Sequence, residues 1–254
     1  MIVRTPQERA TIIEAGKRLG EALKVLEAEV RPGVTTAYLD EVAERFIRDG
    51  GDVPAFKGYM PEGASFPFPA TLCISVNDEV VHGIPGDRVL QEGDIVALDL
   101  GLIHDGLVVD AAVSVGVGEI DAISRALLQA TKESLDRAIA AAKPGNRIGD
   151  ISYATGKAFR DTPFSVVKVL GGHGVGNSVH EEPYIANDGH PGTGPEIVTG
   201  MVLAIEPIAN MGKASVRLAK DGYTYRTHDG TRSAHFEHTI LVEEGGALVL
   251  TRRP

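Results

Sequence analysis

The chain contains an internal duplication, and no other feature constrains its fold as much. The segment RPGVTTAYLDEVAERFIRD, which begins at Arg31, resembles KPGNRIGDISYATGKAFRD, which begins at Lys143. A helical pattern of apolar residues precedes each copy, at Ile12, Leu19, Leu23, Leu26 and Val30 and at Ile123, Leu127, Leu135 and Ile139. We therefore predict one domain over residues 1–254, built from two similar halves at approximately 5–118 and 119–250.

Each copy is followed by a predicted strand that starts with glycine and ends in an acid. GDIVALD ends in Asp99, and GMVLAIE ends in Glu206. Each half then contains a second acid within an alternating apolar pattern, Asp110 in GLVVDAAVSV and Glu237 in SAHFEHTILV. We interpret these acids as two equivalent pairs, which predicts a site between the halves.

The dipeptide Asp105-Gly106 predicts the geometry of the first pair. It favours a two-residue hairpin turn, so Asp99 should lie opposite Ala112. Gly101 should then lie opposite Asp110. Because side chains alternate along a strand, the two aspartates share one face as diagonal neighbours, and the small residues opposite them leave room for a site.

The dipeptide Asp221-Gly222 predicts a second hairpin. Folding the chain there brings Glu206 opposite Glu237. Pro207 and the segment Thr227–Gly230 make an unbroken ladder improbable, and we expect a bulge that shifts the register.

These four acids, together with His173 in GGHGVG, form a candidate metal site. Four carboxylates and a neutral imidazole carry about four negative charges, which two divalent cations would balance. The expected activity is that of a dinuclear hydrolase, in which a hydroxide shared by both cations attacks a peptide carbonyl. Glu206 is the candidate proton shuttle. Cobalt, manganese, iron and zinc all suit such ligands.

The composition narrows the class of protein further. A formal net charge of −10 argues against a basic nucleic-acid footprint. The single cysteine excludes an internal disulfide and fits a reducing compartment. Neither a signal peptide nor a membrane-spanning apolar stretch is visible, so we expect a cytoplasmic protein and a monomer.

Motifs along nearly the whole chain resemble those of the type I methionine aminopeptidases. They are RTPQE, FKGY, CISVNDEVVHGIP, GDIVALD, GGHGVG, HEEP, AIEP, KDGYT and AHFEHT. The resemblance implies an α+β pita-bread fold, in which helices cover the outer face of a pseudo-two-fold antiparallel sheet and a dinuclear metal site lies between the halves. It also implies removal of the initiator methionine from peptides and nascent chains, with the ribosome as a partner.

The resemblance implies a role for individual residues. The metal ligands would be Asp99, Asp110, His173, Glu206 and Glu237, with Asp110 and Glu237 bridging both ions. His82 and His180 would contact the substrate backbone, orienting the scissile amide and stabilising developing charge. The slot for the methionine side chain would be lined by Tyr59, Phe68, Cys73, Val179 and Tyr223.

The chain departs from the family pattern around the slot and beside the metal site. Tyr223 stands where tryptophan is frequent, and Val179 stands where phenylalanine is frequent. Met60–Phe66 forms an extra loop, and Val108-Val109 replaces a frequent His-Gly. His235 alternates with Glu237, which predicts that it faces the metals, although many relatives carry glutamine there. These departures concern the size of the slot and the substrate's approach to it.

Three alternative functions are weighed against this interpretation. Proline-directed peptidases of the same fold carry an extra N-terminal domain, whereas 98 residues precede Asp99 here, so we expect no such domain. A catalytically silent binding protein of this fold would usually lack ligands that this sequence keeps. Cys73 as a nucleophile is disfavoured by its apolar strand context.

Overall fold

The computed structural model describes residues 1–61 and 63–254, and its described residues form an α+β fold, as predicted. The helices are α1 Pro6–Glu29, α2 Thr36–Asp49, α3 Ala122–Ala141 and α4 Ile148–Lys157. The strands are β1 Val53–Pro54, β2 Leu72–Val76, β3 Glu79–Val81, β4 Ile95–His104, β5 Leu107–Gly116, β6 Ser165–Val166, β7 Gly171–Gly174, β8 Glu181–Ala186, β9 Val202–Ile205, β10 Ile208–Asn210, β11 Val216–Leu218, β12 Tyr225–Thr227, β13 Ser233–His235, β14 His238–Glu243 and β15 Gly246–Val249.

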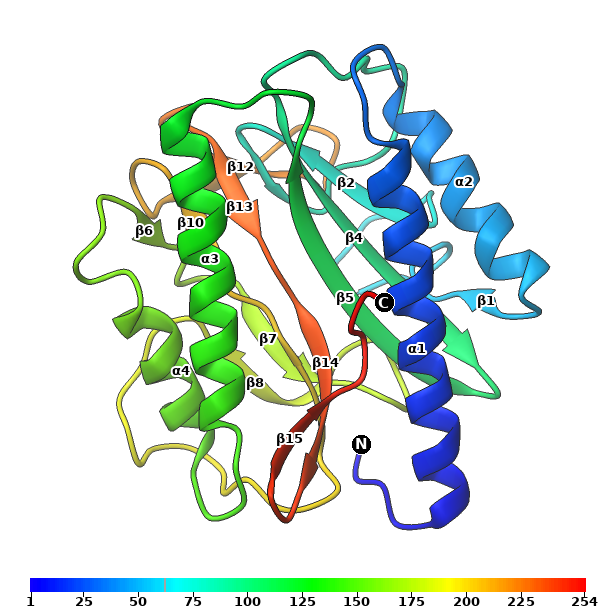
Figure 1. The fold of residues 1–254 in the computed structure, drawn as a ribbon, viewed down its shortest axis with the longest axis vertical. Helices are drawn as coiled ribbons and strands as arrows, with labels where there is room; N and C mark the ends of the chain where they lie inside the picture. Colours follow the sequence, from blue (N-terminus) through cyan, green and yellow to red (C-terminus); the bar gives the residue numbers. More distant parts are fainter. Residues whose placement is uncertain (62) are drawn as a thin grey trace.

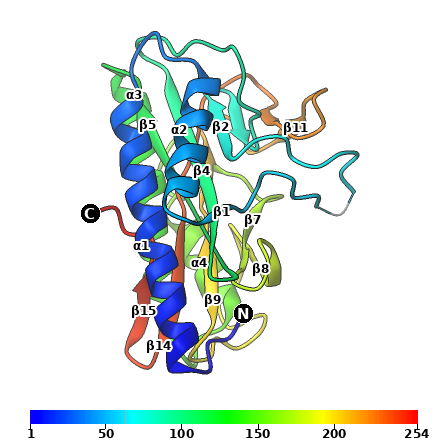
Figure 2. The same cartoon turned by 90° about the vertical axis from the view of Figure 1, so that its right-hand side faces the viewer.

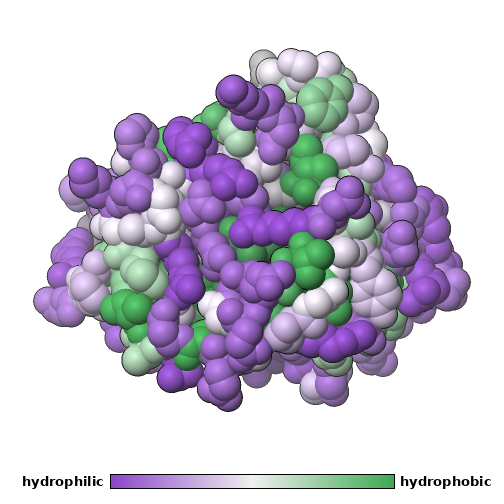
Figure 3. All heavy atoms as spheres, turned by 90° about the horizontal axis from the view of Figure 1, so that it is seen from above, coloured by the Kyte–Doolittle hydropathy of each residue, from purple (hydrophilic) through white to green (hydrophobic). Residues whose placement is uncertain are grey.

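The helices and the strands form two layers. Helices α1 and α3 run side by side over the long strands β4, β5 and β14 (Figure 1), and both lie on one side of the strands in the view turned by 90° (Figure 2). Among the described residues, none of the helices has the length and apolarity needed to span a bilayer. Seen from above, hydrophilic residues cover most of the face and separate its hydrophobic patches (Figure 3).

The strands are paired antiparallel throughout, and the two larger sheets meet at the centre of the molecule. One sheet has the order β1-β4-β2 with β5 paired to β4, and another has the order β15-β14-β9-β7-β8. Ala112 of β5 and Glu237, just before β14, exchange backbone hydrogen bonds of 3.4 and 2.9 Å. Strands from the two halves are therefore continuous across this contact.

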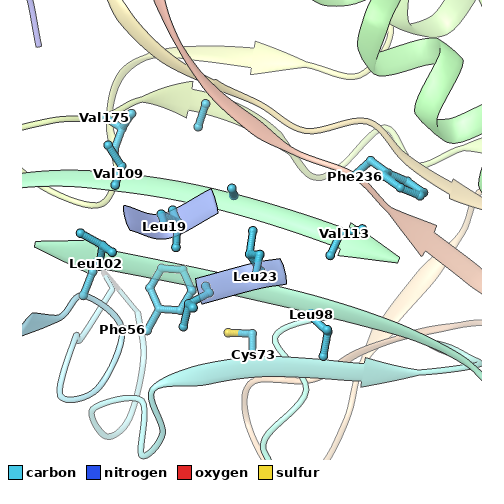
Figure 4. Close-up of a cluster of buried hydrophobic side chains, with 14 of the residues drawn as sticks. Leu19, Leu23, Phe56, Cys73, Leu98, Leu102, Val109, Val113, Val175 and Phe236 are labelled. Carbon is cyan, nitrogen blue, oxygen red and sulfur yellow. The ribbon is translucent and has the colours of Figure 1, made fainter. Parts of the chain in front are cut away.

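The core lies between α1 and the sheet. Leu19 and Leu23 of α1 pack towards β4 and β5 (Figure 4), whose helix-facing side chains include Leu98, Leu102 and Val109. Each of these leucines is at most 1% exposed, and burying such a side chain contributes about 1.5–3 kcal/mol to stability. The opposite face of the same two strands is free to carry the candidate site.

The predicted apolar stripe of α1 is confirmed at Ile12, Leu19, Leu23 and Leu26, whereas Val30 lies just outside the helix as its extended C-cap. The predicted stripe of α3 is wrong at one position. Ile123 is 45% exposed, whereas Leu127 and Leu135 are buried. The inward positions between them hold small hydroxyl residues instead. Thr131 donates a hydrogen bond of 2.8 Å to the carbonyl of Leu127, and Ser134 donates one of 3.1 Å to α4. Small side chains of this kind allow α3 to pack closely on α4.

The first predicted hairpin is confirmed in its register. Asp99 pairs with Ala112, and Gly101 pairs with Asp110. The turn residues Asp105 and Gly106 have φ angles of 46° and 83°, as a type I′ turn requires. The turn therefore fixes which face of β4 and β5 carries the two aspartates.

The second hairpin keeps its predicted register, but the expected shift is wrong. Ile205 pairs with His238 and Ile208 pairs with His235, so Glu206 lies opposite Glu237. The ladder is interrupted at Pro207, which has no backbone N–H, yet its carbonyl still accepts a 3.3 Å hydrogen bond from Phe236. Because this contact keeps the two strands aligned, the interruption causes no slip.

Equivalent turns recur in the two halves. Gly33 and Gly145, from the duplicated Pro-Gly sequences, have φ angles of 89° and 87°, which favour glycine. Their amides donate to the carbonyls of Leu90 and Ile197 over 2.9 and 3.1 Å. We propose on this basis that one domain contains two related halves, at approximately 5–118 and 119–250.

Candidate functional site

The structure brings the five predicted metal ligands together in one cavity. Asp99 and Asp110 come from β4 and β5, His173 comes from β7, and Glu206 and Glu237 lie beside the ends of β9 and β14. The Nε2 atom of His173 lies 3.9 Å from Asp110 Oδ2 and 3.7 Å from Glu206 Oε1. Ligand atoms of Asp110, His173 and Glu237 lie within 4.8 Å of one another. Segments far apart in the sequence thus converge on one point.

The cavity also contains every residue predicted to contact the substrate. Its volume is about 110 Å³. Besides the four acids and the imidazole above, it is lined by the predicted residues Tyr59, Phe68, Cys73, His82, Val179, His180 and Tyr223. Phe56, Pro61 and His235 line it as well. An acidic end and an apolar end therefore share one cavity.

The carboxylates at the acidic end lack the partners that buried charges need. Asp99 Oδ1, Asp110 Oδ1 and Glu237 Oε1 are buried without a hydrogen-bond partner among the described residues. Burial raises the pKa of Asp99 to about 7, and burial together with the neighbouring carboxylates holds the pKa values of Asp110 and Glu237 well above their ordinary range. Cations would remove this penalty, so the donor set fits divalent metal ions.

Glu206 differs from the other acids of the cluster. Burial by itself raises the pKa of Glu206, but His235 foremost, with His173 and His82, outweighs burial and lowers that pKa below its ordinary value. Glu206 is therefore the acid that the protein itself keeps ionised.

Two neutral imidazoles lie beside the cluster. Burial lowers the pKa values of His82 and His180 to about 4. His82 has a φ of 57°, a left-handed conformation that turns its side chain into the cavity just after β3. His180 Nδ1 lies 2.9 Å from the hydroxyl of Tyr59, and its ring centroid lies 4.5 Å from that of His173. Both imidazoles are thus placed to exchange hydrogen bonds with a bound molecule near neutral pH.

Aromatic rings form the apolar end of the cavity. The ring of Tyr223 meets those of Phe66 and Phe68 edge to face, each at a centroid distance of 5.1 Å. Its hydroxyl donates to the carbonyl of Phe66. Residue 62 of the predicted extra loop Met60–Phe66 lies outside the described residues.

Cys73 lies in the wall of this apolar end. Burial raises the pKa of the Cys73 thiol, and the neighbouring Asp99 and Asp110 raise it further. A thiol with a raised pKa stays protonated and is a poor nucleophile. The structure therefore supports the interpretation of Cys73 as a wall residue.

The predicted purpose of Gly101 is wrong. A Cβ atom at Gly101 would lie 2.7 Å from Cε1 of Phe56 and 3.0 Å from Cβ of Ala55. Gly101 therefore makes room for Phe56, a cavity residue that the sequence did not identify. Phe56 belongs to the FKGY motif, whose approach to β4 depends on the pairing of β1 with that strand.

The register corrects the predicted equivalence of the second acids. Ser114 Oγ bonds to the amide and the carbonyl of His235, each over 2.9 Å. Thr239 Oγ1 bonds in the same way to the amide and the carbonyl of Asp110, over 2.9 and 2.6 Å. These two bridges flank the direct contact between Ala112 and Glu237.

Asp110 therefore corresponds in position to His235 and not to Glu237. By the same register, Glu237 corresponds to Ala112. Aligning the two strands by their apolar patterns is therefore wrong by two residues, and the cross-strand pairing gives the correct alignment. Asp99 and Glu206 keep their predicted correspondence, since they lie opposite Ala112 and Glu237.

The prediction that His235 faces the metal site is confirmed. Its Nε2 atom lies 3.4 Å from Glu206 Oε2 and 3.9 Å from Glu237 Oε2. Alternation along the strand was the signal that placed it on this face.

Comparison with known proteins shows which family the chain resembles along its length. Residues 10–244 match the metallopeptidase family M24. Methionine aminopeptidase 1 of Bacillus subtilis is 43% identical over 252 residues, which cover 99% of each chain. The methionine aminopeptidase of Clostridium perfringens is 44% identical over 251 residues, which cover 99% of this chain and 98% of the relative.

Solved structures of related proteins are similar to this chain in fold. The methionine aminopeptidase of Thermotoga maritima is 42% identical, with a TM-score of 0.94 over 99% of this chain and 100% of its own. The prolidase of Pyrococcus furiosus, at 22% identity, has a TM-score of 0.77 over 99% of this chain and 65% of its own, and shares the fold. These similarities confirm the predicted pita-bread fold.

Proposed function

The chain belongs to metallopeptidase family M24, and on this premise we propose that it is a methionine aminopeptidase, which hydrolyses the first peptide bond of chains that begin with methionine. The full-length similarity to enzymes of that name supports the proposal. The observation that carries it is the single cavity in which a buried set of metal-ligand side chains adjoins an apolar slot.

We propose that two divalent cations, of cobalt, manganese, iron or zinc, are held by the five clustered side chains. Asp99, Asp110, His173, Glu206 and Glu237 would supply the ligand atoms. When bound, such cations lower the pKa of a water molecule and polarise the scissile carbonyl. The unpartnered buried oxygens of Asp99, Asp110 and Glu237 support this assignment.

The side chains of the protein perform the remaining steps. Glu206, which is ionised at rest, accepts the proton of the attacking water and passes it to the leaving amine. His82 and His180, neutral near pH 7, hydrogen-bond to the substrate backbone and fix the scissile amide.

The slot selects the side chain that precedes the scissile bond. Tyr59, Phe68, Cys73, Val179 and Tyr223 would enclose it. The thioether of methionine is apolar, flexible and polarizable, and it makes favourable contacts with aromatic rings. A charged side chain would lose its hydration in this slot without gaining a partner.

The proposed substrates are methionyl peptides and nascent chains, the latter presented at the ribosome. We also propose that the protein acts in the cytoplasm and that its working form is a monomer.

Metal analysis of freshly purified protein, paired with turnover of Met-Ala-Ser and of Xaa-Pro peptides, tests the proposal. We expect bound divalent metal and release of methionine from Met-Ala-Ser. Preferential cleavage of the Xaa-Pro peptides would assign the chain to the proline-directed enzymes of the same fold. Bound metal without turnover of either peptide would indicate a silent binding protein.

A further inference from the structure

His235 is a buried imidazole at the metal cluster for which the proposed reaction has no use. Its side chain is 2% exposed. Both ring nitrogens lack a hydrogen-bond partner among the described residues. Leaving a polar group buried and unpartnered costs about 1–3 kcal/mol, so a group in this state requires an explanation.

The backbone of His235 is held as firmly as that of a proposed ligand. The hydroxyl of Ser114 bridges its amide and carbonyl, each over 2.9 Å. The corresponding residue of the other half is Asp110, which the hydroxyl of Thr239 bridges in the same manner. The fold thus presents position 235 to the cluster with the same device that presents Asp110.

The two oxygens of Glu206 face different neighbours. Oε1 lies 3.7 Å from Nε2 of His173, on the side of the proposed ligands. Oε2 lies 3.4 Å from Nε2 of His235. The second separation is close to that of a hydrogen bond, and a small rotation of either side chain would complete the bond.

We propose that His235 is a positioning residue for Glu206. This inference rests on the proposed function. The Nε2–H group of His235 donates a hydrogen bond to Oε2 of Glu206 and fixes the plane of this carboxylate, which transfers the proton during hydrolysis. Partners that orient a metal-site carboxylate in this way typically affect activity 10- to 100-fold.

The variants His235→Leu and His235→Gln separate this role from simple space filling. Leucine fills the position without a donor, whereas glutamine retains an N–H donor. We expect His235→Leu to lower kcat for Met-Ala-Ser about 10- to 100-fold while KM changes less than about threefold. We expect His235→Gln to restore kcat to within about threefold of the original protein.

The variant His104→Gln is the matched control for losing a histidine. His104 is partly buried away from the cavity, where its Nδ1 lies 2.7 Å from Asp52 Oδ1. We expect its kcat to stay within about twofold of the original value. Equal kcat values in the His235→Leu, His235→Gln and original proteins would show that His235 only fills space, which would overturn the proposal.

A competing role for His235 is direct coordination of a cation. Calorimetric titration with Mn²⁺ tests it without any reliance on activity. We expect His235→Leu to weaken Mn²⁺ binding by no more than about 100-fold, through the loosened Glu206, and His235→Gln to bind Mn²⁺ within about threefold of the original protein, because the donor to Glu206 is kept. Equal losses of Mn²⁺ affinity in His235→Leu and His235→Gln would make His235 a ligand and overturn the positioning role.

The ¹⁵N spectrum of the zinc-loaded protein provides a second readout independent of turnover. We expect a protonated Nε2 for His235 whose signal shifts when Glu206 is replaced by glutamine. A nitrogen signal typical of zinc coordination, or a signal that Glu206→Gln leaves unchanged, would contradict the proposal. If the original protein showed no turnover of Met-Ala-Ser, the proposed function would fail, while this spectrum would still decide whether the hydrogen bond exists.

Discussion

The two halves of the molecule make the same backbone contacts but carry different side chains at corresponding positions. Asp110 of β5 corresponds to His235 of the other half, and Ala112 corresponds to Glu237. The duplicated fold therefore provides paired positions around its centre, and the two halves place side chains of different chemical types at these positions. An asymmetric set of ligands arises from a nearly symmetric backbone.

A second difference concerns the long helix of each half. Counted back from the C-caps Val30 and Ala142, Gly20 of α1 corresponds to Lys132 of α3. The chain's last residues cross α1 so closely that a Cβ at Gly20 would lie 2.3 Å from the carbonyl oxygen of Arg252. Lys132 of α3, by contrast, is exposed. The C-terminal residues of the second half thus cross the helix α1 of the first half at Gly20.

Replacing a central acid of the proposed metal site should have the largest effect. Asp110→Asn keeps the size of the side chain but removes a charge from the proposed bridge, so we expect the fold to persist while metal and activity are lost together. Since metal-assisted catalysis provides several kcal/mol, kcat should fall about a thousandfold or more. Metal content, kcat and circular dichroism check this.

The control for this prediction removes an acid outside the site. Asp121 caps α3, and asparagine caps a helix equally well, so Asp121→Asn should leave metal content and kcat unchanged. A near-normal rate in Asp110→Asn would show that its bridging role is misassigned.

Removing the two hydroxyl bridges tests whether they hold the corresponding positions 110 and 235 in the same way. Thr239→Val frees the backbone of Asp110, and Ser114→Ala frees that of His235. Each change leaves a buried amide and carbonyl unpartnered, at a cost of about 1–3 kcal/mol in the free energy of unfolding. Urea titrations of both variants measure this cost.

The activities of the same variants distinguish the two positions. Thr239→Val should lower kcat about 10- to 100-fold, because Asp110 is a proposed ligand, and Ser114→Ala should lower it less. Thr239→Ser, which keeps the hydroxyl, should restore most of the loss. A larger kcat loss in Ser114→Ala than in Thr239→Val would reverse the ranking of Asp110 and His235.

The crossing of α1 gives a smaller, purely structural effect. Gly20→Ala would place a methyl group against the backbone of Arg252, so we expect the free energy of unfolding to fall by about 1–3 kcal/mol. Lys132→Ala, at the corresponding position of α3, should change it by less than about 0.5 kcal/mol. Similar urea midpoints for both variants would show that the segment around Arg252 moves aside without lowering the free energy of unfolding.

The smallest expected effect concerns pH. Burial lowers the pKa of His238 from 6.5 to about 3, whereas the corresponding residue of the other half is the apolar Val113. Between these two pH values the unfolded chain binds more protons at this histidine, so the free energy of unfolding falls as pH falls from 6.5 towards 3.

Replacing His238 should therefore flatten part of this pH dependence. In the metal-free protein, we expect His238→Gln to reduce the loss of stability between pH 6.5 and pH 5 by about 1 kcal/mol. Urea unfolding at both pH values tests it. The other half offers the control, since Val113→Ile should leave the slope unchanged; an unchanged slope in His238→Gln would place the acid sensitivity elsewhere.

The sequence predicted those parts of the site that depend on local geometry. The turn at Asp105-Gly106 fixes a register, and the register fixes the face of every residue on β4 and β5. Counting outward from the turn at Asp221-Gly222 also gave the register of the second hairpin. The count holds because the hydrogen bond from Phe236 to Pro207 keeps the strands aligned where the ladder is interrupted. The pocket residues came instead from family motifs, since spacing alone does not show where Tyr59 or Val179 lies.

Local patterns were sufficient to predict the duplicated order of elements and the placement of acids on one face of each strand pair, because turn chemistry and the alternation of side chains act over a few residues. The folded chain was needed to show that Asp110 matches His235, that Phe56 fills the space at Gly101, and that the C-terminal residues cross α1 at Gly20. These facts depend on close packing between segments far apart in the chain, and no local pattern records which distant atoms will meet.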